Sequence, residues 1–264
     1  MTAMQKIAVC GKGGCGKSVV TRLLAGGLRA RGYRVLVVDA DESNTGLPRM
    51  IGFDHAPKPL LELFGGKAAV EAKVSALISG GAREESIQLL ETEIRTKNTP
   101  PDYIVEMDGV RLVEVGKILM SLEGCSCPMG IVSRSFLKML KLDPDEVAVV
   151  DLEAGVEHFG RGVETGVDCV LVVVDPSIDS MQLAGRISNM AEQVQIGDVW
   201  AVLNKITSKS IAERLSSRLA QGGIKVIGAI PMDEEIFESC LEGRPIRRGV
   251  AAKEVDGILD FLFP

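Results

Sequence analysis

A glycine-rich stretch near the start of the chain carries residues whose types and spacing suit phosphate chemistry. Residues 11–18 read Gly-Lys-Gly-Gly-Cys-Gly-Lys-Ser and fit the pattern G-x-x-x-x-G-K-[ST] of a phosphate-binding loop. Glycines let backbone N–H groups turn toward phosphate oxygens, Lys17 would contact the β- and γ-phosphates, and Ser18 would bind Mg²⁺. The alternative is a glycine-rich turn without a ligand. We expect the nucleotide to contact Gly13, Gly14, Cys15, Gly16, Lys17, Ser18 and Val19.

Acidic residues in two later stretches supply the rest of an ATP site. Asp39 and Asp41 follow a β-branched run, and strand alternation places them on the same side as the chain leaves the sheet. Asp41 would then orient the attacking water. Asp151 closes a very apolar run, where it could hold Mg²⁺ through a water as a Walker B aspartate does. Each aspartate taken singly could instead cap a helix or lie in a solvated loop.

A second chemical motif lies in the middle of the chain. Cys125 and Cys127 form a Cys-x-Cys pair that is followed by Pro128. Two thiolates are soft metal ligands, but they cannot close a tetrahedral site alone, so one chain supplies half a site. A symmetric dimer would bring four sulfurs together on its two-fold axis. Two incidental cysteines, or a redox pair, are the alternatives.

Repeated apolar runs indicate the elements that position these residues. β-Branched runs alternate with helix-length patterns at 181–194 and 211–221, which predicts an α/β fold with a doubly wound, mostly parallel sheet flanked by helices. Ligands of such sheets bind at the carboxyl ends of the strands, where Asp39 and Asp151 lie. The predicted strands span residues 7–10, 33–39, 147–151, 169–175, 199–204 and 225–230.

Residues 55–124 break this alternation. Patterns at 60–64, 70–78 and 83–96 predict helices, and Asp108-Gly109 predicts the type I′ turn of a hairpin within 103–115. No low-complexity linker separates this stretch from the rest. We therefore expect one domain spanning 1–264, with an elaboration at 55–124.

Charge and composition exclude some classes of partner. The chain has 264 residues, with 36 acidic residues against 30 Lys and Arg, and a formal charge of −6, which argues against nucleic-acid or anionic-membrane binding. The apolar and acidic tail at 255–264 also argues against a membrane anchor. Since the first residues lack the apolar stretch of a signal peptide, we expect a cytoplasmic protein with reduced cysteines.

Lys12 indicates which class of phosphate-binding loop this chain contains. A lysine directly after the first glycine resembles the deviant Walker A motif of the family that contains ParA, MinD, the nitrogenase iron protein and several metallochaperone ATPases. In that family this lysine reaches the phosphates of the partner subunit in an ATP-dependent homodimer, which implies a catalytic role for Lys12; the alternative is a solvated loop lysine. Segments that resemble the adenine-binding parts of these ATPases are Asn204-Lys205 and Pro231-Met232-Asp233, although an asparagine that ends a strand is also an ordinary turn residue.

Taken together, the motifs resemble the CooC-type ATPases, the nickel-handling accessory proteins of carbon monoxide dehydrogenase maturation. The resemblance combines the deviant Walker A loop, residues 39–44, the Cys-x-Cys pair and residues 153–158, and it departs at Glu153, where glycine is common. It implies ATP hydrolysis and Ni²⁺ binding by Cys125 and Cys127, with apo carbon monoxide dehydrogenase as client; ligand softness also permits Zn²⁺. The alternatives are a ParA/MinD-like positioning ATPase and a nitrogenase iron protein-like ATPase with an intersubunit [4Fe–4S] cluster.

Overall fold

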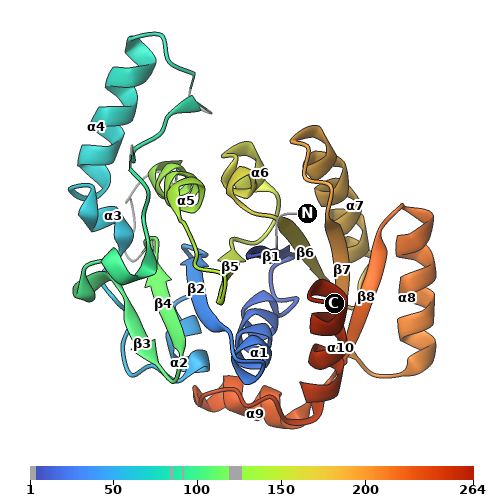
Figure 1. The fold of residues 1–264 in the computed structure, drawn as a ribbon. Helices are drawn as coiled ribbons and strands as arrows, with labels where there is room; N and C mark the ends of the chain where they lie inside the picture. Colours follow the sequence, from blue (N-terminus) through green and yellow to red (C-terminus); the bar gives the residue numbers. More distant parts are fainter. Residues whose placement is uncertain (1–3, 84–85, 91, 119–126) are drawn as a thin grey trace.

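One mostly parallel sheet forms the centre of the protein (Figure 1). The structure, a computed structural model, describes residues 4–83, 86–90, 92–118 and 127–264. In this part of the chain eight strands lie in the order β3-β4-β2-β5-β1-β6-β7-β8, and β3 alone runs antiparallel to its neighbour. The fold class is as predicted. The strands are β1 Lys6–Gly11, β2 Arg34–Ala40, β3 Val105–Met107, β4 Val110–Glu114, β5 Glu146–Leu152, β6 Cys169–Val174, β7 Val199–Ile206 and β8 Lys225–Pro231.

Helices cover both faces of the sheet, because alternate strand residues are apolar on each face. In β1, Ile7 and Val9 belong to the apolar core that includes residues of α1 (Lys17–Ala30), α2 (Leu47–Ile51) and α10 (Ala252–Leu262). Ala8 and Cys10 belong to the core on the other face, which includes residues of α5 (Cys127–Met139), α7 (Ile178–Gln193) and α8 (Lys209–Gln221). The short helices α6 (Glu157–Gly160) and α9 (Glu234–Glu242) follow β5 and β8. Among the helices described, none is long and apolar enough to cross a membrane.

The middle of the chain combines two helices with a hairpin that joins the main sheet. α3 (Leu60–Leu63) and α4 (Gly66–Ser79) match two predicted helices, and α4 projects beyond the sheet in Figure 1. The hairpin prediction is confirmed, since Asp108 and Gly109 both have positive φ between antiparallel β3 and β4. The single-domain assignment with an elaboration at 55–124 stays a prediction.

The helix predicted at 83–96 is wrong for the described residues of that stretch. Ile87 and Leu89 are both buried, and the backbone between them runs alongside α5. Side chains of α5 take the place of helical hydrogen bonds, since Arg134 donates to the Ile87 carbonyl and Ser135 accepts from the Leu89 N–H. Tertiary hydrogen bonds therefore override the local helical pattern.

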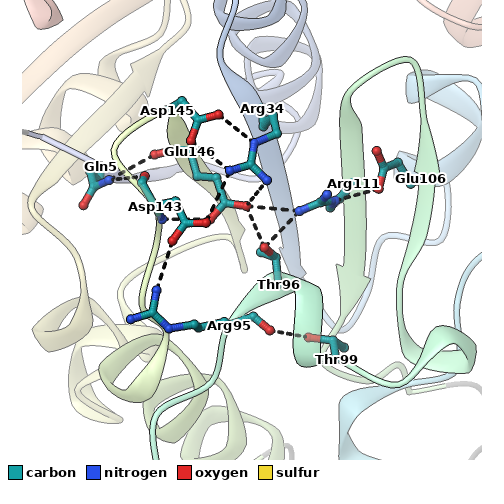
Figure 2. A network of polar contacts seen from close by, with 10 residues as sticks. All are labelled: Gln5, Arg34, Arg95, Thr96, Thr99, Glu106, Arg111, Asp143, Asp145 and Glu146. Carbon is teal, nitrogen blue, oxygen red and sulfur yellow. Dashed lines mark hydrogen bonds and ion pairs between the residues drawn. The ribbon is translucent and has the colours of Figure 1, made fainter.

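A polar network ties this middle region to the amino ends of β2 and β5 (Figure 2). Glu146 is 3% exposed and lies at its centre. Its carboxylate accepts from the Thr96 hydroxyl at 2.6 Å and lies 3.1 Å from an Arg111 nitrogen and 3.3 Å from an Arg34 nitrogen. The site residues lie at the opposite, carboxyl ends of the strands, so this network supports the fold without contacting the site.

Replacement of Glu146 by alanine should destabilise the protein by about 1–3 kcal/mol, because the buried Thr96 hydroxyl and Arg111 lose their buried acceptor, whereas Arg34 keeps Asp145. Urea unfolding measures this change. Glu106→Ala is the matched control, since Glu106 pairs with the same Arg111 from an exposed position and should cost below about 1 kcal/mol. Equal losses for the two variants would contradict the central role of Glu146.

Candidate functional site

The glycine-rich loop connects β1 to α1 at the carboxyl end of the sheet. Gly14 and Gly16 have φ values of 77° and 98°, a region that disfavours side chains, and Gly16 is the residue that precedes α1. A Cβ at Gly16 would collide with the Asn204 amide, which donates to the Cys15 carbonyl at 2.9 Å. Glycine is therefore required at position 14 for the backbone turn, and at position 16 both for the turn and for the close contact with Asn204 of β7.

Lys17 and Asp41 lie together beneath this loop. Both side chains are almost fully buried, and Lys17 Nζ is 4.0 Å from Asp41 Oδ2. The other oxygen of Asp41 accepts from the N–H of Ser43 at 2.9 Å and from its hydroxyl at 2.6 Å. These bonds fix the orientation of the carboxylate, with its other oxygen toward Lys17, and Asp41 lines the cavity beside the phosphate loop.

Ser18 and Asp151 are also in direct contact. The Ser18 hydroxyl donates to Asp151 Oδ2 at 2.5 Å and accepts from the Asn44 amide at 2.7 Å. Burial raises the pKa of Asp151 to about 6, against the opposing effect of the Ser18 hydrogen bond. A hydroxyl and a carboxylate are hard oxygen ligands, which fit Mg²⁺. A cation bound here would also supply a positive charge to balance the buried carboxylate of Asp151.

Lys117 is a residue of this region that the sequence analysis missed. Glu114, Asp39 and Asp151 stand side by side on β4, β2 and β5, so three acidic residues share one level of the sheet. Lys117 Nζ lies 2.7 Å from Asp39 Oδ2 and 4.0 Å from Glu114, and it donates to the Asp41 carbonyl at 2.6 Å. Burial still raises the pKa of Asp39 to about 8. No local motif marks Lys117, because its two nearest partners, the Asp39 carboxylate and the Asp41 carbonyl, are more than 70 residues away in sequence.

A cavity of about 530 Å³ extends from the phosphate loop to α9. Its volume lies in the range of ligand pockets. Asp233 caps α9 through the Ile236 N–H at 3.1 Å, and Lys205 donates to the Gly14 carbonyl at 2.7 Å. The structure thus brings the five residues predicted at the adenine to one cavity, with apolar residues that sequence reasoning missed. The predicted residues on its wall are Asn204, Lys205, Pro231, Met232 and Asp233, and the additional apolar ones are Met50, Ile236 and Phe237.

Two residues of the loop differ from their neighbours. Lys12 is half-buried and is not among the described residues that line the cavity of its own chain. Cys15 is buried, and this burial raises the pKa of its thiol to about 11. The Cys15 thiol is therefore unreactive and packs in the core, and the role of Lys12 stays a prediction.

The Cys-x-Cys pair falls at the edge of the described structure. Cys125 lies outside the described residues, and Cys127 is the first residue of α5, with its side chain not described. Among the residues that are described, no group of three or more His, Cys, Asp or Glu side chains could hold a metal ion. Metal binding by Cys125 and Cys127 stays a prediction.

We expect His158 to make the stability of the protein depend on pH. It is 2% exposed in α6, and burial lowers its pKa to about 4. Because the unfolded histidine, with a pKa near 6.5, binds the proton more readily, its contribution is complete above about pH 6.5 and is lost as the pH falls toward 4. We expect the loss to reach about 3 kcal/mol.

Urea unfolding of the wild type and His158→Gln between pH 7 and 4 measures this effect as a difference. Raised carboxyl pKa values nearby, such as that of Asp151, act in both proteins and cancel. His55→Gln, at the exposed histidine, is the control. A constant difference between wild type and His158→Gln across this pH range would contradict a buried neutral imidazole.

Fold and site together define a P-loop nucleotide-binding protein. The chain belongs to the CobQ/CobB/MinD/ParA nucleotide binding domain family, which it matches over residues 6–246. It is similar to an uncharacterized ATP-binding protein of Methanocaldococcus jannaschii, with 39% identity over 97% of this chain and 99% of that protein. The carbon monoxide dehydrogenase accessory protein CooC of Rhodospirillum rubrum is 31% identical, covering 98% of each chain. The septum site-determining protein MinD of Pyrococcus horikoshii, solved with Mg-ADP, has the same fold, with a TM-score of 0.67, 18% identity and coverage of 98% of this chain and 96% of that one.

Proposed function

We propose that this protein is an ATP-dependent homodimeric metallochaperone that binds nickel through Cys125 and Cys127 and delivers it to apo carbon monoxide dehydrogenase. The observation that carries this proposal is the Cys-x-Cys pair in the sequence, whose second cysteine is the first residue of α5, in a chain that matches the accessory protein CooC over 98% of its length. ParA-like and MinD-like positioning activities have the likeness to solved structures in their favour, but at 15 to 20% identity that likeness concerns the fold alone. A MinD-like protein of Mesostigma viride is 27% identical to this chain, below the 31% of CooC.

Contacts among the described side chains support the nucleotide half of the mechanism. Ser18 and Asp151 would hold Mg²⁺, and Lys17 would neutralise the β- and γ-phosphates. Asp41, oriented by Ser43, would align the attacking water. Lys12 of each subunit would clamp the phosphates bound to the other, so hydrolysis would require two chains.

The metal half depends on that dimer. Each chain contributes two thiolates, and dimerisation around ATP would place four around one ion. Hydrolysis removes the γ-phosphate, and the loops that carry Asp41 and Asp151 would then relax and alter the thiolate cage. Zn²⁺ satisfies the same ligands, so the choice of Ni²⁺ rests on the likeness to CooC.

Metal analysis of anaerobically purified protein tests the proposal. With a non-hydrolysable ATP analogue, we expect one Ni²⁺ or Zn²⁺ per dimer, and no bound metal in the Cys125→Ala, Cys127→Ala double variant. Cys240→Ala is the thiol control: Cys240 on α9 also lines the nucleotide cavity, so the nucleotide affinity of this variant is measured alongside, and its metal content should equal that of the wild type. Metal retention by the double variant would show that the site is elsewhere, and a brown protein containing iron and sulfide would favour the iron protein alternative.

A further inference from the structure

Arg161 joins two loops of the nucleotide site through one guanidinium group. Its Nη1 atom lies 3.2 Å from Glu42 Oε1 and 3.0 Å from Glu153 Oε2. Glu42 directly follows Asp41, and Glu153 comes two residues after Asp151. A displacement of either loop would therefore change the ion pairs of the Arg161 guanidinium.

These ion pairs are shielded from water. The side chains of Glu42, Arg161 and Glu153 are 5%, 17% and 24% exposed. Charges with so little solvent contact interact more strongly than surface pairs, and loss of one partner leaves the others poorly compensated. The arrangement explains the glutamate at position 153, for which the sequence analysis had no role.

Helix α5 holds Arg161 at two further points. The methylene stem of Arg161 packs on Gly130, where an added Cβ would collide with Arg161 Cδ. Arg134, one turn further along α5, donates to the Arg161 carbonyl oxygen at 2.5 Å. Gly130 is three residues after Cys127, so this contact lies in the turn of α5 that begins with the motif.

Residues that precede the Cys-x-Cys pair in sequence contact the loop that carries Asp41 and Glu42. The Ile118 N–H donates to the Glu42 carbonyl at 3.0 Å, next to the bond from Lys117 to the Asp41 carbonyl. The loop that carries Asp41 and Glu42 is thus attached to residues that precede and follow the Cys-x-Cys pair in sequence.

We propose that Arg161 is a positioning residue that transmits the state of the nucleotide site to helix α5. Its partners on the site side are Glu42 and Glu153, and its contacts on the helix side are Gly130 and Arg134. An effect of Arg161 on metal affinity rests on the proposed function, whereas an effect of Arg161 on the conformation of α5 does not.

Hydrogen exchange of the α5 amides at 131–137 tests the transmission without any metal. In the wild type, the exchange rates should differ between ADP and a non-hydrolysable ATP analogue by roughly five-fold or more, the lower end of ordinary coupling between sites. Arg161→Met and the isosteric Glu42→Gln should reduce this ratio toward one while nucleotide still binds. Arg186→Met, an exposed arginine on α7, should keep the wild-type ratio.

A glycine pair gives an independent test that leaves every charge in place. Gly130→Ala should displace the Arg161 stem and reduce the same ratio. Gly185→Ala is the matched control, since it is also a helical glycine but has no atom within 4 Å of an added Cβ. Alanine suits both helices, so only the contact with Arg161 distinguishes the two variants.

The same proteins should then be titrated with Zn²⁺ as the probe in the two nucleotide states. A nucleotide-dependent Zn²⁺ affinity that Arg161→Met abolishes would support transmission to the motif. A wild-type exchange ratio of one, or an unchanged ratio in both Arg161→Met and Glu42→Gln, would overturn the proposal. If exchange in α5 depends on the nucleotide and on Arg161 but the protein binds no Zn²⁺, the role of Arg161 would be supported and the metallochaperone function would be contradicted.

Discussion

Lys12→Ala should lower ATP turnover by roughly 10³- to 10⁵-fold, the range measured when a GTPase loses the cation supplied by its partner. The reason is that Lys12 lies outside its own cavity and would neutralise charge on the phosphates of the other subunit. Nucleotide binding by the single subunit should change little. Phosphate release and equilibrium nucleotide titration measure the two quantities separately.

Mixing two inactive variants shows whether Lys12 acts across the dimer. A Lys12→Ala subunit keeps Lys17 and can receive Lys12 from a Lys17→Met partner, so one of the two sites in a mixed dimer is complete. An equal mixture should recover about a quarter of wild-type turnover if subunits pair at random. An equal mixture with no recovery would contradict action in trans.

Lys17→Met should lower turnover by roughly 10²- to 10³-fold, as loss of one preorganised charge on the reacting group does. Unlike Lys12→Ala, it should also weaken nucleotide binding in the single subunit, because Lys17 lies inside the cavity and 4.0 Å from Asp41. The same phosphate-release and titration measurements apply.

Lys209→Met is the control for this second change. Lys209 starts α8, and its side chain is 91% exposed, so its removal should leave turnover and affinity as in the wild type. A Lys17→Met protein with wild-type affinity would contradict the placement of Lys17 on the phosphates.

The central predictions from sequence concerned features that form locally. The phosphate loop fits within residues 11–18, and the hairpin turn depends on Asp108 and Gly109, whose positive φ values the structure confirms. Apolar runs of four to seven residues also predicted the strands, since their burial requires helices on both faces. The helix prediction at 83–96 was wrong because structure there does not form locally. The backbone groups of Ile87 and Leu89 bond to Arg134 and Ser135, which belong to a helix far away in sequence.

By itself, the sequence determined that a nucleotide phosphate loop follows the first strand and that Asp39, Asp41 and Asp151 end later strands, since parallel strands bring their carboxyl ends to one edge. Only the tertiary structure decided which partners these charges have. Lys117 lies 78 residues from Asp39, and Arg161 lies 119 residues from Glu42, as the sequence numbers show. Pairing over such separations depends on strand order and helix packing, and no local spacing encodes either. The loop at 11–18 can therefore be recognised from the sequence, whereas the side chains that connect the loops after β2 and β5 to α5 are seen only in the folded structure.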